Sequence, residues 1–130
     1  MKINSYVKRD VVILEPMGKL LPGQSVGQLD EKLYALIGRK QNRVIIDLSK
    51  TAQIGSSGIS ILLHHHMKFR EIGGNLKLAN LTKNIQQIIA ITRLSLVFDV
   101  FDSLEQALNS FGEQVPANED SQIRMAVGNS

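Results

Sequence analysis

The stretch that most constrains the fold is the apolar run Val44-Ile45-Ile46, framed by Arg43 and by Asp47-Leu48. It is short, rich in β-branched residues and apolar on both alternating faces, which is typical of a central strand covered on both sides. Such strands occur in parallel sheets that have helices packed on each face. The rest of the chain must therefore supply neighbouring strands and covering helices.

Four segments have apolar residues at intervals of three and four, the pattern of helices that bury one face. Each has an expected start or end signal in its polar residues or glycines. The expected helices run from an N-cap at Ser25 to Gly38, from Ser57 to Ile72, onward from a cap at Thr82, and from an Asp102-x-x-Glu105 capping box to Phe111.

The remaining apolar runs predict strands that alternate with these helices. Ile3–Val7 and Val11–Pro16 flank a short polar turn and indicate a hairpin, and further strands are expected at 76–80 and 96–101. Alternation of this kind is typical of βαβ units. We therefore predict an α/β fold with a mixed, mostly parallel sheet of about four to five strands and four to five helices.

A chain of 130 residues with 43% hydrophobic residues suits one domain with one continuous core. After Phe111 the composition shifts to Gly, Pro, Asn, Glu, Ser and Gln without a sustained period. We expect residues 1–111 to form the domain and residues 112–130 to be a flexible tail.

Composition also argues against several classes of function. The chain has no cysteine, which removes disulfides and thiolate chemistry, and no apolar stretch long enough for a membrane helix. The N-terminus lacks the apolar region of a secretory signal, so we expect a cytoplasmic protein without membrane insertion. The formal charge is +3, but the basic residues are scattered and aromatics are only 5%, so nucleic-acid binding is not indicated.

The segment with the most chemical information is Gly55-Ser56-Ser57-Gly58, between a strand end and a predicted helix. Its glycines permit a tight turn, and its serines place hydroxyls beside unpaired N–H groups and the positive end of the helix dipole. Two interpretations follow. One serine could simply cap the helix. Alternatively, Ser56 could accept a phosphoryl group, whose charge of about −1.5 to −2 would change affinity for a partner.

The run His64-His65-His66 raises the alternative of a metal-binding protein or an enzyme. Consecutive helical residues point about 100° apart, and positions 68–70 hold no usual ligand, so no pair shares a face. A hydrolase based on Ser56 or Ser57 would need a nearby base, but the histidines lie two helical turns further on, about 10 Å away. We therefore expect no catalytic residue, no metal and no cofactor, with His66 in the core and His64 in solvent.

At this point the sequence resembles the STAS domains, typified by bacterial anti-sigma factor antagonists, over about residues 3 to 111. The order and spacing of several short motifs support the resemblance together. These motifs are Asp47-Leu48-Ser49, Ile54-Gly55-Ser56-Ser57-Gly58-Ile59, Glu71-Ile72-Gly73-Gly74, Leu76-Lys77-Leu78, Ile91-Thr92-Arg93-Leu94 and the segment 101–108.

The resemblance implies a non-catalytic regulator that works by partner switching. In that family a serine kinase, which is also the anti-sigma factor, phosphorylates the first serine of a D-S-[ST]-G loop, and a phosphatase resets the switch. Carried over by position, the phosphoacceptor is Ser56, with Ser57 as the alternative and as the expected helix cap. The implied partner-binding residues are Gly55, Ser56, Ser57, Gly58 and Leu21.

Two positions of the implied partner surface differ from the family pattern. The usual Asp before the phosphoacceptor is Gly55 here, and an acidic residue common near the first helix is Leu21. These differences favour a second function, in which the domain docks constitutively as a scaffold subunit of a stress-signalling or lipid-transport complex. The sequence leaves both functions open, along with the oligomeric state.

Overall fold

The computed structural model describes residues 2–112, apart from the side chain of Gln24. The strands are β1 (Lys2–Lys8), β2 (Val11–Leu20), β3 (Arg43–Asp47), β4 (Thr51–Ile54), β5 (Asn75–Ala79) and β6 (Asp99–Phe101). The helices are α1 (Gln24–Gly38), α2 (Ser56–Glu71), α3 (Lys83–Ile91) and α4 (Leu104–Ser110), with a short 3-10 helix, η1 (Leu94–Leu96). The predicted tail lies almost entirely outside the described residues and stays a prediction.

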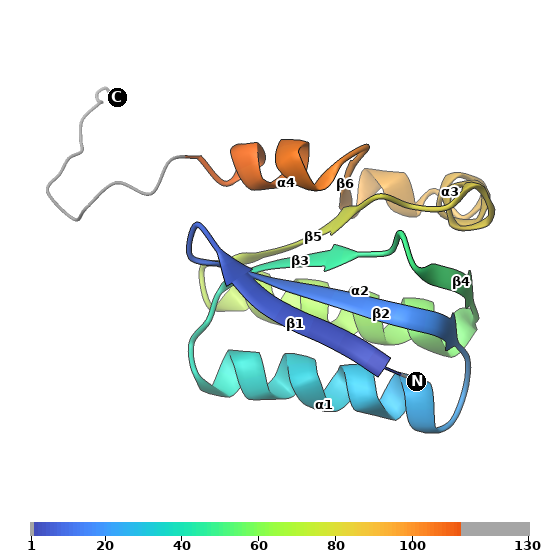
Figure 1. Cartoon of the computed structure of the whole chain (residues 1–130), viewed down its shortest axis with the longest axis horizontal. Coiled ribbons are helices and arrows are strands. Elements are labelled where there is room, and N and C mark those ends of the chain that lie inside the picture. The colour runs from blue at the N-terminus through green and yellow to red at the C-terminus, as the bar shows by residue number, and fades with distance from the viewer. Residues whose placement is uncertain (1, 113–130) are drawn as a thin grey trace, which may run out of the picture.

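The strands form one mixed sheet in the order β1-β2-β3-β5-β6, with β4 added beside β2 (Figure 1). The hairpin pair β1 and β2 is antiparallel, and the other pairings are parallel. This confirms the predicted α/β class and the mixed, mostly parallel sheet.

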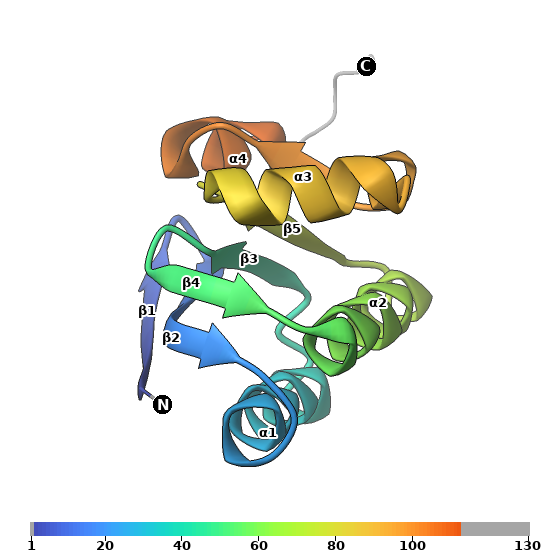
Figure 2. The same ribbon diagram turned by 90° about the vertical axis from the view of Figure 1, so that its right-hand side faces the viewer.

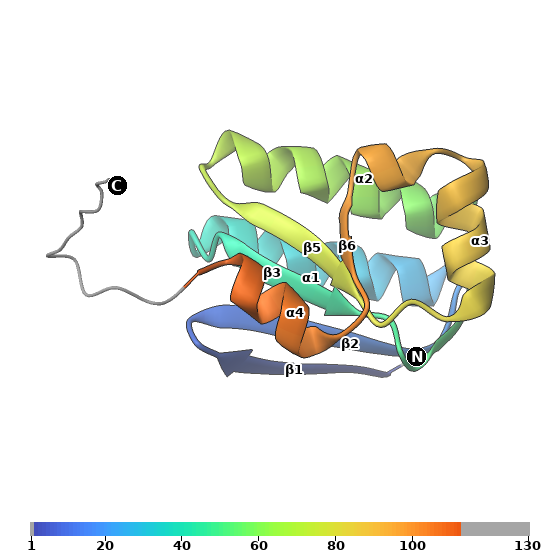
Figure 3. The same ribbon diagram turned by 90° about the horizontal axis from the view of Figure 1, so that it is seen from above.

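The helices cover both faces of the sheet (Figures 2 and 3). Helices α1 and α2 lie side by side on one face, α4 lies on the opposite face, and α3 crosses the end of the sheet near β4. Val44 and Ile46 of β3 pack in the α1–α2 core, whereas Ile45 packs in the smaller core beneath α4. All three side chains are fully buried, as the sequence predicts for a strand covered on both faces.

Strand β4 is missing from the sequence prediction. Strands β3 and β4 pair with successive parts of the long strand β2. β3 pairs with Val12–Leu14, and β4 pairs with Gly18–Leu20 near its end. Thr51 anchors the start of β4, because the buried hydroxyl donates a 2.8 Å hydrogen bond to the carbonyl of Pro16. Four residues with only their ends buried give too little alternation to detect.

The predicted caps of α1 and α4 are wrong. Helix α1 has Gly23 as its N-cap, with φ 112°, and the Ser25 hydroxyl instead donates to the carbonyl of Leu21 at 3.0 Å. In α4 the cap is Ser103, one residue later than predicted, and its hydroxyl accepts from the Gln106 amide at 3.1 Å. The Gln106 side chain accepts from the Asp102 amide instead, so the predicted capping box does not form. Both errors arise because backbone turn geometry, rather than the first available polar side chain, selects the cap.

The strand predicted at 96–101 is shorter than expected and begins at Asp99. Before it the chain turns through η1, where the Leu94 carbonyl accepts from the amides of Val97 and Phe98 at 3.0 and 2.9 Å. Phe98 is buried in the larger core. Residues 96–98 therefore form the end of η1 and the turn after it instead of a strand, and this turn places the Phe98 side chain in the core.

Candidate functional site

The loop at residues 55–58 lies at the end of the sheet where β4 leads into α2 (Figure 1). The end of β2 and the start of α1 lie beside it, since Gly55 donates a 2.9 Å backbone hydrogen bond to the carbonyl of Leu20. This is the carboxyl end of the parallel strands, the position at which α/β sheets commonly place binding sites.

Gly58 allows the start of α2 to pack directly on the end of β2. A Cβ at this position would lie 2.8 Å from Cγ1 of Ile54 and 3.1 Å from the carbonyl oxygen of Leu20. Real Cβ atoms essentially never approach another heavy atom within 3.0 Å, so the contact with Ile54 would force a shift. The glycine therefore fixes where the helix begins and places Ser56 at the surface.

Gly55 and Leu21 lie in contact, although 34 positions separate them along the chain. A Cβ at Gly55 would lie 3.3 Å from Cδ2 of Leu21. Gly55 has φ −99° and ψ 179°, an extended conformation open to any residue, so space rather than backbone strain constrains it. The structure thus brings together the two positions at which the sequence lacks the expected carboxylates.

The two serines of the loop have different environments. Ser56 is the first residue of α2 and is exposed, whereas the Ser57 hydroxyl is buried and has no hydrogen-bond partner among the described residues. The N-cap is Gly55, and neither serine makes a side-chain cap bond. The prediction that Ser57 caps the helix is therefore wrong, because the helix begins one residue earlier than expected.

The electrostatic setting of Ser56 suits an anion. The first turn of α2 contains no acidic residue, so no side-chain carboxylate there offsets the positive end of the helix dipole. Asp47, at the end of β3, is buried and accepts hydrogen bonds from the Ser49 amide at 3.0 Å and from Asn80 Nδ2 at 3.3 Å. Its carboxylate is thus committed to the end of β3.

A hollow of about 460 Å³ lies next to the loop, between β4 and α3. Ile54, which precedes Gly55, forms part of its wall with Ile88 and Ile91 of α3, and Lys19 lies at its edge. Ile91 is 81% exposed, an unusual position for a large apolar side chain. The sequence did not predict this apolar wall, because its position depends on how α3 crosses the end of the sheet.

The three histidines point to separate partners. The exposed His64 hydrogen-bonds the Tyr34 hydroxyl at 2.9 Å, and the buried His66 contacts the Leu76 carbonyl at 3.4 Å, which confirms their predicted burial. His65 is also fully buried, with Nε2 2.6 Å from Oδ1 of Asp30. Burial lowers the pKa of His65 despite this carboxylate.

Comparison with known proteins agrees with this fold. The sequence model of the STAS domain matches residues 2–107, so the chain belongs to the STAS domain family. It is 25% identical over 109 residues to BtrV of Bordetella bronchiseptica, named as a candidate anti-sigma factor antagonist, covering 84% of this chain and 94% of BtrV.

Solved structures show the same fold. A candidate anti-sigma factor antagonist from Thermotoga maritima matches with a TM-score of 0.78 and 17% identity over 83% of this chain and 92% of its own. The phosphorylated form of the Bacillus cell fate determinant SpoIIAA matches with a TM-score of 0.68 and 18% identity, over 85% of this chain and 99% of SpoIIAA. The fold of this chain is therefore that of the anti-sigma factor antagonists. In residues 2–112 no helix has the length and apolarity needed to cross a membrane.

Proposed function

We propose that this protein is a partner-switching regulator that binds a serine kinase acting as an anti-sigma factor. The binding surface consists of residues 55–58 together with Leu21, and phosphorylation of Ser56 weakens binding. A phosphatase restores the unmodified form. The observation that carries this proposal is the contrast within the serine pair, since Ser56 is exposed and the Ser57 hydroxyl is buried.

A phosphate on Ser56 is compatible with the fold. It would lie at the N-terminus of α2, where free N–H groups and the helix dipole favour an anion. The first turn holds no acidic residue that would repel it. The same modification on Ser57 would require its buried hydroxyl to leave the protein interior. Ser56 is therefore the acceptor that needs no local unfolding.

The surface around Ser56 explains how a phosphate would change partner affinity. Leu21 lies against Gly55, and the hollow beside the loop exposes the apolar side chain of Ile91. A partner covering this surface would bury apolar area. A phosphate adds about −1.5 to −2 charges, whose burial against such a surface is costly. The charge therefore opposes binding without refolding the domain.

The comparisons support the same proposal. BtrV is named as a candidate anti-sigma factor antagonist, and SpoIIAA has been solved in phosphorylated and unphosphorylated forms. The exposed serine of this chain occupies the start of α2 in a domain of that fold.

A second function is constitutive docking as a scaffold subunit of a larger complex. The observation in its favour is the contact between Gly55 and Leu21, which leaves the expected kinase-facing carboxylates absent from one continuous patch. In this case the same surface binds a partner, but Ser56 is not a switch.

The two functions differ in how the partner responds to charge at Ser56. The partner is captured from host extract on the immobilised protein, and its affinity is measured for Ser56→Ala and Ser56→Asp. The switch predicts that Ser56→Ala binds like wild type and that Ser56→Asp binds at least about tenfold more weakly, a difference of about 1.4 kcal/mol. Ser60→Asp, on an exposed position of the same helix, is the matched control and should bind normally.

Equal binding by Ser56→Asp and Ser56→Ala would favour constitutive docking and contradict the switch. If Leu21→Arg also left binding unchanged, the partner would lie elsewhere, and both functions would fail for this surface.

A further inference from the structure

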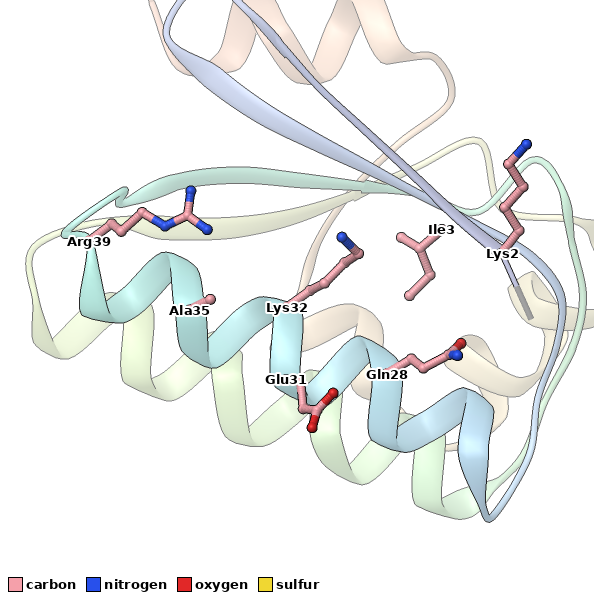
Figure 4. Close-up of a pocket in the computed structure, with 7 residues that line it drawn as sticks. All are labelled: Lys2, Ile3, Gln28, Glu31, Lys32, Ala35 and Arg39. Atoms are coloured by element: carbon pink, nitrogen blue, oxygen red, sulfur yellow. The ribbon is translucent and has the colours of Figure 1, made fainter.

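A second hollow, of about 550 Å³, lies between β1 and α1 (Figure 4). Ile3 of β1 and Ala35 of α1 form its apolar part. The side chains of Lys32 and Arg39 reach from α1 into the space beneath β1. Glu31 also lines the hollow, with its side chain directed away from β1. The hollow thus joins an apolar floor to two cations from one helix.

These cations have no carboxylate partner among residues 2–112. The four ion pairs of that part of the chain involve other residues, and Asp30 of α1 turns to His65 instead. Lys32 and Arg39 are exposed, so a lone small anion would gain little from either of them. A ligand with several negative charges, held also by other contacts, would gain from both.

The strand above the hollow has an open edge that can supply those contacts. Among residues 2–112, β1 pairs with β2 alone. The turn between them has two residues, Arg9 and Asp10, both with positive φ, and Lys8 is the partner of Val11. In a hairpin with a two-residue turn, the residues next to the turn bond to each other, so here Lys8 bonds to Val11. The backbone N–H and C=O groups of Val7, Ser5 and Ile3 therefore face the open edge.

We propose that the edge of β1 and this hollow bind an extended acidic segment of a partner protein by strand addition. The backbone of the segment pairs with the outward groups of β1, and its alternate side chains point toward α1. Acidic side chains at those positions meet Lys32 and Arg39, and apolar ones meet Ile3 and Ala35. This surface is separate from the loop at Ser56.

Charge also argues against a second copy of the chain as the occupant of this edge. An antiparallel pairing of two β1 strands centred on Ser5 would set Lys2 of each copy opposite Lys8 of the other. Like charges directly opposite each other destabilise a strand pair. Lysines at both ends of an edge strand are a common device against self-association.

The test uses the full chain and a fluorescent synthetic peptide of alternating glutamate and valine, with an alternating lysine and valine peptide for comparison. Fluorescence anisotropy should show saturable binding of the acidic peptide and no binding of the basic one. The affinity for the acidic peptide should fall as the salt concentration is raised. Lys32→Glu should weaken binding about tenfold. Lys83→Glu, an exposed position on α3 that gives the same change in net charge, should leave it unchanged.

Amide hydrogen exchange by NMR distinguishes strand addition from simple charge attraction. The amides of Ile3, Ser5 and Val7 should exchange fast in the free protein and slowly with the acidic peptide bound. Three results with peptide present would overturn the proposal. They are no binding at about 1 mM peptide, equal weakening by Lys32→Glu and Lys83→Glu, and binding without protection of these amides. Protection without peptide that rises with protein concentration would assign the edge to a second copy, which also overturns it.

Discussion

Gly58 illustrates how one residue positions the functional loop. The α2 helix can start against the carbonyl of Leu20 only because no side chain intervenes, and this contact holds Ser56 outward. The sequence identified the glycine as a turn residue. It could not show the close approach, because the contact depends on β4 pairing with the end of β2.

The packing of Gly58 can be tested with the same substitution at two helical glycines. Gly58→Ala should lower the free energy of unfolding by about 1–3 kcal/mol, because the new Cβ overlaps Ile54 and the Leu20 carbonyl. Gly27→Ala, where a Cβ meets nothing within 4 Å, should raise it by about 0.4–1 kcal/mol. Urea denaturation measures both. A neutral Gly58→Ala would show that the start of α2 can shift.

His65 makes the stability depend on pH. Its Nε2 faces Asp30, but Nδ1 is buried without a partner among the described residues, so a second ring proton would be unsatisfied there. Burial lowers the pKa of His65, nearby His64 lowers it further, and Asp30 opposes both. The unfolded chain, with a histidine pKa of about 6.5, then binds more protons than the folded chain in mildly acidic solution.

The melting temperature should therefore fall as the pH is lowered below about 6.5. His65→Gln should reduce this pH dependence, because glutamine cannot titrate there. His64→Gln, at an exposed position of the same helix, should retain most of it. Scanning calorimetry between neutral and mildly acidic pH checks the prediction. A slope that is identical in wild type and His65→Gln would contradict it.

Among the helices and strands, those defined by a local apolar pattern were predicted from the sequence, and the strand defined by pairing with a distant segment was missed. The four helices and the buried strand β3 followed from apolar spacing. Strand β4 did not, because its four residues are a strand only through pairing with the far end of β2. The helices α1 and α2 also begin earlier than predicted. Their N-caps are the glycines that follow β2 and β4, Gly23 and Gly55, rather than the serines expected from the sequence.

The caps of α3 and α4 give a matched pair for measurement. Ser103 accepts a hydrogen bond from the Gln106 amide, whereas the Thr82 hydroxyl, also at an N-cap, is buried with no partner in the described part of the chain. Ser103→Ala should lower the free energy of unfolding by about 1 kcal/mol. Thr82→Ala should not lower it, because the buried hydroxyl has no hydrogen bond to lose. Equal losses in chemical denaturation would mean that Thr82 does cap its helix in solution.

At the scale of the whole molecule, the fold collects its candidate partner surface at one end of the sheet. The β4–α2 loop, the end of β2 and helix α3 meet there, although they come from three separate parts of the sequence (Figure 1). The serine pair and its glycines could be predicted from sequence because they are contiguous. The apolar flank at Ile88 and Ile91 and the burial of Ser57 could not, because both depend on packing between elements.

The central claim is that Ser56 is the modified residue of a partner switch. The most direct measurement is the intact mass of the protein purified from its host, and again after incubation with host extract and ATP, with fragmentation to locate any phosphate. A partner switch at Ser56 predicts a single phosphate on that residue, lost in Ser56→Ala and retained in Ser57→Ala. A chain that stays unmodified, or a phosphate on Ser57 that persists in Ser56→Ala, would contradict it.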